Sequence, residues 1–565
     1  MGGPMIIAAL VLLTTSPSVK LDDRGATVVL SNDLMSVTID KATATIPDLR
    51  LGNSPNLAGK GGYFAVANSG GKDGWDIKNG RFRVIRNTPE LVEVATEAPV
   101  GGCLFDQHYV VKKGEPGFYV FVKMARPAGL SPENFGQVRW SFYLNPNLFT
   151  YEWSNDDEHG IIPDLTGAEK VQDATYRTKD GAVYTKYNLV DYVDGHYVHG
   201  ITGQKPGSYG AFVVMGSNEY LGAPTKQYIT VHSGPIIHRF LNSGHFMPRG
   251  LAHPALPDKW TKFCGPWFIY LNRGDTPQAM WADAKRRAEQ ERRQWPYGWV
   301  QDPQYPVRRA SVSGQLVKSG GSDIADALIV MTTPGSDWQT QILDYNYSVH
   351  TDRQGRFELP AVRPGTYSLH AVIPGETEEF QKETVTVGES GNVKLGRLEY
   401  SPSIHDRALW QIGEIDRTAR GFRLSDQPRQ YGLEQKVPAS LTYRIGSSRP
   451  DQDWYYCQAK AGDWNVEFDR PVAVSGELML TLGIAGQTND PRLEVLLNGV
   501  SIGQVTTAGN SSAQYRSAIL GSSYYEVKRL TFPSTRLQPG KNTLTLRLSK
   551  GAIHYDTVRL SSLLP

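Results

Sequence analysis

Hydrophobic and polar residues alternate over short stretches along most of this chain. A period of two residues, in segments rich in Val, Ile, Phe, Tyr and Thr, is typical of β-strands that bury one face. Pro and Gly recur between these segments and indicate turns. The pattern therefore predicts an all-β protein, with strands at residues 26–30, 35–39, 118–122, 138–144, 236–241, 312–316, 327–331, 352–359, 362–369, 478–484, 492–497, 543–548 and 552–560.

One segment, residues 276–294, has the pattern of an amphipathic helix. Pro277 falls in its first turn, where a proline costs no hydrogen bond, and one face of the helix is heavily charged. The basic residues on that face could suggest a nucleic-acid site. A solvated helix that closes a β-domain explains them better.

Three domains follow from the length of 565 residues and from the distribution of strands. Residues 19–305 are expected to form one large β-sandwich, and a proline-rich linker ends it. Residues 306–400 form a small sandwich that looks like a fibronectin type III module. Residues 401–565 form a β-domain that resembles jelly-roll carbohydrate-binding modules, and Asn498-Gly499 is a strong signal for a hairpin turn in it.

Composition limits the classes of function. Lys and Arg number 59 and Asp and Glu 57, so the net charge of +2 argues against nucleic acid as a partner. The apolar run at residues 5–15 resembles the core of a signal peptide over residues 1–18, which predicts secretion. A first strand or a misplaced start are the alternatives. No later segment is long and apolar enough to cross a membrane. The three cysteines are too few for a disulfide framework and are interpreted as buried apolar residues.

Three segments of the first domain supply candidate reactive groups. Asn242, Ser243 and Gly244 end a β-branched, aromatic strand, and His245 follows at once, where a strand meets a loop. Arg139 lies in a predicted strand. Lys186 lies between two tyrosines. Taken alone, each has an ordinary explanation: a loop histidine, a surface arginine, and a lysine whose stem packs on aromatic rings.

The order of these motifs is similar to that of a known family. Arg139, then Tyr184-Thr-Lys186-Tyr187, then Asn242-Ser-Gly-His245 resembles the catalytic domain of rhamnogalacturonan endolyases, polysaccharide lyase family 4. The segments 264–274 and 412–419 match the family too. The resemblance covers nearly the whole chain after residue 18. It implies a galactose-mutarotase-like catalytic sandwich, a fibronectin-like spacer and a jelly roll.

The resemblance implies endo-acting β-elimination on rhamnogalacturonan I, at the linkage between rhamnose and the 4-position of galacturonate. The product would carry an unsaturated galacturonate at its new non-reducing end. A cation must neutralise the uronate carboxylate, a base must remove the C5 proton, and an acid must protonate O4. By family precedent Arg139, Lys186 and His245 take these roles. The sequence leaves open an exchange of roles between Lys186 and His245.

The chain departs from the family pattern at some positions. Tyr143 stands where some members carry a second arginine, four residues after the first. His238 and Arg239 occupy a strand that is rich in aromatic residues in fungal members. Together with Tyr187, these three are the candidate substrate-binding residues. The family works without a catalytic metal, and a structural calcium ion elsewhere is an open alternative; the acidic loop at residues 155–159 is interpreted as solvated.

The expected partner is thus a pectic polysaccharide, bound by a secreted monomer. Two other functions stay in competition. The chain could be a pectin-binding protein that keeps the scaffold without the reaction. It could also be a hydrolase that uses two carboxylates, with candidates Asp106, Asp156, Asp157 and Glu158.

Overall fold

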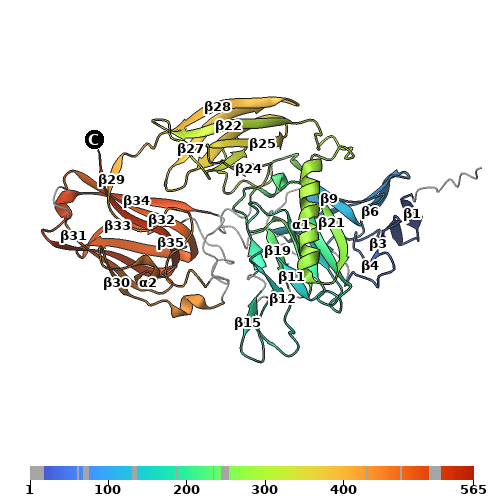
Figure 1. The fold of residues 1–565 in the computed structure, drawn as a ribbon, viewed down its shortest axis with the longest axis horizontal. Coiled ribbons are helices and arrows are strands. Elements are labelled where there is room, and N and C mark those ends of the chain that lie inside the picture. The colour runs from blue at the N-terminus through green and yellow to red at the C-terminus, as the bar shows by residue number, and fades with distance from the viewer. Residues whose placement is uncertain are drawn as a thin grey trace, which may run out of the picture.

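The structure is a computed structural model, and its strands gather into three bodies (Figure 1). These are a large domain from β1 to helix α1, a spacer domain from β22 to β28, and a C-terminal domain from β29 to β35. The predicted all-β class is confirmed. The structure describes residues 18–59, 63–67, 76–129, 137–172, 174–185, 189–232, 234–243, 254–427, 431–470, 474–507 and 524–564. At residues 63–67 it describes the backbone alone. The predicted signal segment lies outside them.

Two sheets packed face to face form the core of the large domain. The five-stranded sheet runs in the order β16 (Val190–Asp191), β19 (Ile229–His232), β20 (Ile236–Asn242), β10 (Gln137–Tyr143) and β5 (Tyr63–Ala67). The nine-stranded sheet runs in the order β12 (His159–Ile161), β11 (Tyr151–Trp153), β17 (Val198–Thr202), β18 (Ser208–Met215), β21 (Thr261–Gly274), β9 (Gly117–Ala125), β8 (Cys103–Lys112), β7 (Leu91–Val100) and β6 (Arg81–Asn87).

The alternation of side chains along each strand explains the packing between these sheets. In β10, Val138, Trp140 and Phe142 are fully buried, whereas the residues between them face the other side of the sheet. The Trp140 ring meets Trp267 of β21 at a centroid distance of 6.0 Å. Large aromatic side chains of this kind bury much apolar area, so they hold the two sheets together.

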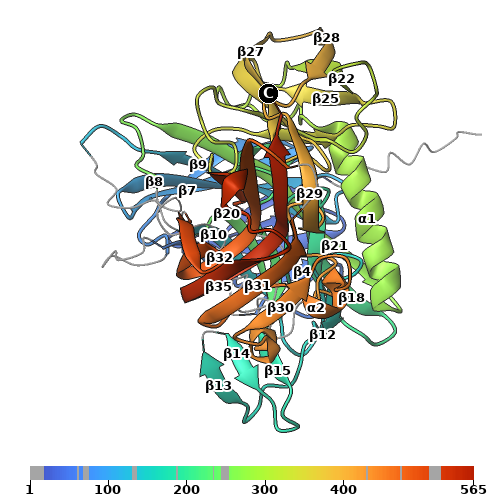
Figure 2. The ribbon, with the colours of Figure 1, turned by 90° about the vertical axis from the view of Figure 1, so that its left-hand side faces the viewer.

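Two smaller sheets flank the large domain. Antiparallel strands make up both of them. One comprises β1 (Lys20–Asp23), β2 (Thr27–Ser31), β3 (Met35–Asp40) and β4 (Asp48–Leu51). The other comprises β13 (Glu169–Gln172), β14 (Thr175–Arg177) and β15 (Val183–Thr185), and it projects from the domain at the bottom of Figure 2.

Helix α1 (Pro277–Gln294) confirms the predicted helix and its first turn. Thr276 caps it, because its hydroxyl accepts a hydrogen bond of 3.1 Å from the Ala279 amide, and Pro277 takes the first helical position. The apolar face packs on the nine-stranded sheet, where Trp281 stacks on Trp153 at 5.1 Å. Most of the charged face lies outside, as the sequence predicts, but Glu291 is an exception. It is fully buried and accepts hydrogen bonds from Tyr119, Tyr297 and Arg287.

The spacer domain is a sandwich of two small sheets with its own core. In one sheet β22 pairs with β28 in parallel and with β25 in antiparallel fashion. The strands are β25 (Arg356–Val362), β22 (Ala310–Lys318) and β28 (Asn392–Tyr400) in that sheet, and β24 (Tyr347–His350), β23 (Leu328–Thr332), β26 (Gly365–Val372) and β27 (Glu379–Val387) in the other.

Two long strands dominate the C-terminal domain. Residues 478–484 and 492–497 belong to one strand, and residues 543–548 and 552–560 to another, although the sequence predicts two separate strands in each case. Irregular pairing between the two halves explains the difference, since the register shifts between Thr488 and Arg492. The strands are β29 (Asp406–Gly413), β30 (Leu441–Arg444), β31 (Gly462–Asp469), β32 (Glu477–Leu497), β33 (Val500–Thr506), β34 (Glu526–Pro533) and β35 (Lys541–Leu563).

The predicted hairpin turn and the predicted state of the cysteines are both confirmed. Asn498 and Gly499 have φ angles of 51° and 81° and join β32 to β33, which is the backbone that an Asn-Gly turn favours. The three cysteines are buried and unpaired. Four short helices complete the described structure: η2 (Glu219–Leu221), η3 (Leu433–Lys436), α2 (Pro450–Asp453) and η4 (Ser534–Arg536).

A buried ion cluster joins the large domain to the spacer domain. The Glu219 carboxylate accepts hydrogen bonds from Arg309 Nη1 at 2.5 Å and from Arg363 Nε at 2.8 Å. The Glu219 and Arg309 side chains are 1% exposed and that of Arg363 is 7% exposed. Loss of Glu219 would leave two buried guanidinium groups without their counter-charge, and breaking a buried ion pair in this way costs about 3–5 kcal/mol. The cluster therefore fixes the position of the spacer.

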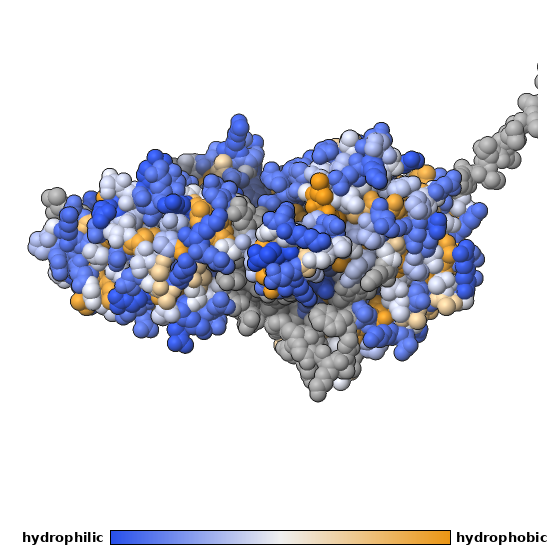
Figure 3. Space-filling view, turned by 90° about the horizontal axis from the view of Figure 1, so that it is seen from below, coloured by the Kyte–Doolittle hydropathy of each residue, from blue (hydrophilic) through white to orange (hydrophobic). Residues whose placement is uncertain are grey.

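Hydrophilic residues cover most of the face seen from below, and hydrophobic ones are scattered among them (Figure 3). Scattered exposed apolar residues of this kind are normal on protein surfaces. In the described part of the chain, no helix has both the length and the apolar character that crossing a membrane requires.

Candidate functional site

The five-stranded sheet contains Arg139 and a strand next to each of the other two predicted catalytic segments. Arg139 lies in β10, and β20, the strand that runs up to the Asn242-Ser243 turn, is its neighbour in the sheet. On the other side of β20, strand β19 pairs with β16, the first strand after the Lys186 segment. One sheet therefore contains β10, the strand β16 about fifty residues later, and the strand β20 about a hundred residues later.

Lys186, Tyr187 and His245 lie outside the described residues. Their immediate neighbours are described. Thr185 ends β15 and is fully buried, and its hydroxyl accepts a hydrogen bond of 2.8 Å from Thr175. Ser243, two residues before His245, is fully buried as well. The chain thus enters both segments from fixed positions.

Arg139 lies on the face of the sheet that points away from the core of the sandwich. It stands opposite Phe240 in the register, and its guanidinium carbon lies 5.9 Å from the centroid of that ring. Among the described residues, Nε of Arg139 has no hydrogen-bond partner and no carboxylate forms an ion pair with the guanidinium. An arginine of this kind can accept an external carboxylate.

Asp76 provides the nearby negative charge. Burial raises the pKa of the Asp76 carboxyl, and the positive charges of Lys78 and Arg139 oppose that rise only in part. Asp76 Oδ1 is buried without a hydrogen bond among the described residues. Asp76 is thus a described carboxyl whose charge interacts with that of Arg139.

Two other predicted residues, Tyr143 and His238, share the face of the sheet that carries Arg139. Ser141 and Tyr143 follow Arg139 at intervals of two along β10. His238 stands opposite Ser141 on β20, and its Nδ1 lies 2.8 Å from the Ser141 hydroxyl. Arg139, Tyr143 and His238 are thus brought together, although His238 is only 3% exposed.

Arg239 points to the opposite side of the sheet. Its side chain has no solvent exposure, and Nη2 donates to Asn218 Oδ1 at 3.1 Å and to the Tyr220 hydroxyl at 3.0 Å. Because neighbouring residues on a strand face opposite ways, His238 and Arg239 cannot both face the same ligand. Arg239 would influence a bound sugar only through the residues that it holds.

A β-bulge separates Arg139 from the end of β20. Val138 pairs with Asn242 but Arg139 pairs with Phe240, so β20 carries one extra residue at this point. Bulges bend a strand and redirect its side chains, and they are frequent beside active sites. Here the bulge redirects the last residues of β20 just before the Asn242-Ser243 turn.

Glu152 is a buried carboxyl beside the Lys186 segment that the sequence analysis missed. The Tyr184 hydroxyl donates to Glu152 Oε1 at 3.3 Å, which ties β15 to β11. Glu152 is 1% exposed, and burial raises the pKa of its carboxyl to about 8. The group is therefore mostly protonated at neutral pH and adds little charge. A glutamate in a three-residue strand gives no sequence signal of burial.

The carboxylates considered for hydrolysis have other partners. Burial would raise the pKa of Asp106, but hydrogen bonds and charges from His108 and Arg83 outweigh it and lower the pKa to about 2. Asp156 binds Lys285 Nζ at 2.7 Å and accepts a hydrogen bond from Trp281 Nε1 at 2.6 Å. A carboxyl that stays ionised is a poor general acid, so neither residue suits that role.

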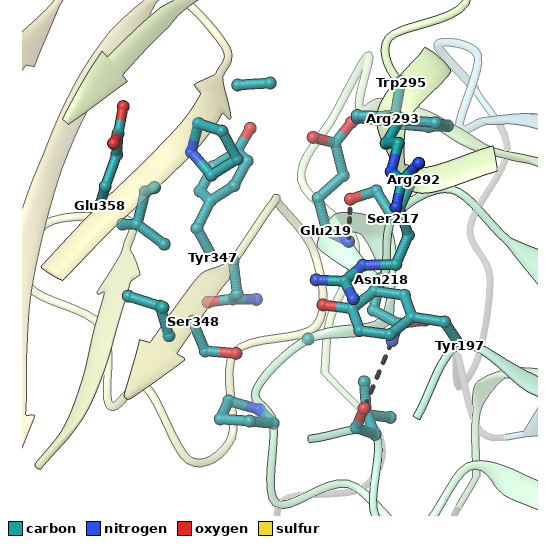
Figure 4. Close-up of a pocket in the computed structure, with 18 of the residues that line it drawn as sticks. Tyr197, Ser217, Asn218, Glu219, Arg292, Arg293, Trp295, Tyr347, Ser348 and Glu358 are labelled. Carbon is teal, nitrogen blue, oxygen red and sulfur yellow. Dashed lines mark hydrogen bonds between the residues drawn. The ribbon is translucent and has the colours of Figure 1, made fainter. Parts of the chain in front are cut away.

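A cavity of about 670 Å³ lies between the large domain and the spacer. Figure 4 shows Tyr197, Glu219 and Arg292 on one wall and Tyr347 and Glu358 on the other. Two arginines already bind the Glu219 carboxylate, and no residue of β10 or β20 lines the cavity. We therefore assign this cavity to the junction between domains.

The chain is similar to known proteins over nearly its whole length. Residues 311–395 and 408–560 match family models described as polysaccharide lyase family 4, domain II and domain III. The chain is 32% identical to a rhamnogalacturonate lyase of Dickeya dadantii, over 99% of this chain and 97% of the relative. It is 24% identical to a probable rhamnogalacturonate lyase B of Aspergillus flavus, over 98% and 96%. A galactose mutarotase-like protein from Lactobacillus casei is 10% identical over 44% of this chain and 100% of its own, with a TM-score of 0.28.

Proposed function

Because this chain belongs to polysaccharide lyase family 4, and is a polysaccharide lyase, we propose that it cleaves rhamnogalacturonan I within the polymer by β-elimination. The relatives named as rhamnogalacturonate lyases support this substrate. The linkage cleaved joins rhamnose to the 4-position of galacturonate, and the bond that breaks is C4–O4 of galacturonate. The new non-reducing end carries a galacturonate with a double bond between C4 and C5.

The first chemical requirement is to acidify the C5 hydrogen of galacturonate. Loss of this proton places negative charge next to a carboxylate, which is unfavourable unless a cation neutralises that carboxylate. Arg139 meets the requirement, because a planar guanidinium can bind both carboxylate oxygens. One observation about Arg139 carries the proposal. Arg139 forms no ion pair with the described residues, and it lies in the sheet whose strands adjoin the Lys186 and His245 segments.

The second requirement is a base and an acid on either side of the bond that breaks. In the assignment that we propose, Lys186 removes the C5 proton, the electron pair forms the C4–C5 double bond, and the C4–O4 bond breaks. His245 gives a proton to the departing O4. The unperturbed pKa of histidine, about 6.5, suits an acid near neutral pH. The exchange of these two roles is the alternative.

The proposal is tested by incubating the protein with purified rhamnogalacturonan I and following ultraviolet absorbance. The conjugated uronate formed by elimination absorbs, and the intact polymer does not. A rapid fall in viscosity would show cleavage within the chain. Binding without absorbance would favour a pectin-binding protein, and new reducing ends without absorbance would favour hydrolysis; either result overturns the proposal.

We assign no metal to the reaction and propose a secreted monomer. In the described residues, no group of three or more His, Cys, Asp or Glu side chains could hold a metal ion. Because the family resemblance implies a reaction without a catalytic metal, dialysis against EDTA is expected to leave turnover unchanged, and a loss that calcium restores would contradict the assignment. Recovery of the protein from the culture medium as a monomer, with its new N-terminus near residue 18, tests secretion and the signal segment.

A further inference from the structure

The end of β20 is fixed by a tyrosine that the proposed mechanism does not use. The Tyr228 hydroxyl donates a hydrogen bond of 3.0 Å to Asn242 Oδ1 and accepts one of 3.2 Å from the Ser243 amide. Tyr228, Asn242 and Ser243 have no solvent exposure. One buried phenol therefore contacts the two residues that stand three and two positions before His245.

We propose that Tyr228 is a positioning residue for His245. This inference rests on the proposed function, in which His245 protonates the departing O4. The hydroxyl defines the direction in which the chain leaves β20, through one side-chain and one backbone contact. A change at Tyr228 would then alter where the imidazole stands relative to the sugar, without removing any group that touches it.

The surroundings of Tyr228 suit a rigid support. Its ring lies 6.2 Å from that of Phe240, the residue that stands opposite Arg139 in the register. Burial raises the pKa of the Tyr228 phenol, so the hydroxyl keeps its proton and remains a donor at every working pH. Catalytic groups need support of this kind, because a displacement of about 1 Å can lower a rate about 100-fold.

The bulge in β20 explains why a support is needed at this position. The extra residue disrupts the regular ladder between β10 and β20 just before Asn242. The Ser243 amide follows the last paired residue of β20, and Tyr228 supplies its acceptor. The Tyr228 hydroxyl thus supplies the hydrogen-bond acceptor at the first position beyond the paired residues of β20.

The test is Tyr228→Phe in the full chain, which removes the hydroxyl and keeps the ring. We expect kcat to fall about 10- to 100-fold with KM within about twofold, and the limb of the pH–kcat profile that reports His245 to shift. The control is Tyr109→Phe in the same domain. That phenol also donates one hydrogen bond, to the Ala44 carbonyl at 2.6 Å, and accepts one, from Gln107. The control should keep kcat and the pH profile.

A purely structural role would give a different result. If Tyr228→Phe and Tyr109→Phe lower the melting temperature alike and leave kcat and the pH profile unchanged, the inference is wrong. Asn242→Ala is the second variant, since it removes the acceptor and leaves Tyr228 in place, and it should reproduce the loss of kcat. Its failure to do so would also contradict the inference.

A double variant separates this inference from the proposed function. If Tyr228 acts through His245, adding Tyr228→Phe to His245→Ala should cause no further loss of turnover. A further loss of about tenfold or more would contradict the inference. If His245→Ala itself keeps native turnover, His245 is not the acid that protonates O4, and that part of the proposed function is wrong. If His245→Ala is inactive and Tyr228→Phe is fully active, only the role of Tyr228 is overturned.

Discussion

Gln339 of the spacer domain forms two hydrogen bonds with the backbone of one residue of the C-terminal domain, Tyr525. Gln339 Oε1 accepts from the Tyr525 amide at 2.8 Å, and Nε2 donates to the Tyr525 carbonyl at 3.2 Å. The Gln339 carbonyl in turn accepts a hydrogen bond from Lys226 of the large domain. A single spacer residue therefore contacts both other domains.

Gln339→Ala is predicted to loosen the C-terminal domain without unfolding it. Two net hydrogen bonds are worth about 1–3 kcal/mol together, and their loss should separate the unfolding transitions of the domains. Calorimetry measures this. Gln315→Ala is the matched control, because Gln315 also makes two hydrogen bonds, both inside the spacer. Equal effects of the two variants on the C-terminal transition would contradict the role of Gln339.

Asp556 predicts a pH dependence of stability in the C-terminal domain. It is fully buried, and its Oδ1 accepts from the amides of Asp416 and Arg417 at 3.0 and 3.1 Å, while the Tyr525 hydroxyl binds Oδ2 at 2.5 Å. Burial raises the pKa of Asp556 from 3.8 to about 7, although these hydrogen bonds oppose the rise. Between these two values the folded state holds a proton that the unfolded state has lost.

The contribution of Asp556 to the free energy of unfolding therefore decreases as pH rises through this window, and the decrease is complete above it. Asp556→Asn should remove that slope, because its amide can keep the same contacts in neutral form. Urea unfolding at about pH 5 and about pH 8 tests this, and the variant should lose less stability between them than the wild type. An identical pH dependence in both proteins would contradict the shifted pKa.

Arg139→Ala is predicted to weaken substrate binding and to slow turnover further. In the proposed mechanism the substitution removes the charge that stabilises the carbanion, and loss of one such donor typically costs about 100- to 1000-fold in kcat. Arg139→Lys keeps the charge but not the planar pair of donors, so it should recover only part of the rate. Steady-state kinetics on rhamnogalacturonan I measure both. A native value of kcat/KM for Arg139→Ala would show that Arg139 does not act in the reaction.

The sequence predicts the fold well where local chemistry decides the structure. Thr276 and Pro277 start helix α1 as expected, and Asn498-Gly499 forms its hairpin, because capping and turn geometry depend on few neighbouring residues. The long strands β32 and β35 were predicted as two strands each. Irregular pairing interrupts their alternation, and a sequence pattern cannot distinguish such a break from a loop.

The site is harder to predict than the fold, because it depends on partners distant in sequence. Arg139 and His238 share a face as a two-residue period allows, but nothing in the sequence shows that Arg239 would be buried against Tyr220. Tyr228 and Glu152 look like ordinary strand residues. Their importance lies in hydrogen bonds to segments 14 and 32 residues away, which only the fold reveals.

The most direct test of the account is a crystal structure of the inactive Lys186→Ala variant with a rhamnogalacturonan oligosaccharide. We predict that one galacturonate carboxylate binds the Arg139 guanidinium, with C5 facing position 186 and O4 within hydrogen-bond reach of His245. An oligosaccharide bound elsewhere, or Arg139 and His245 on opposite sides of the bound sugar chain with neither near the bond to be cleaved, would contradict the account.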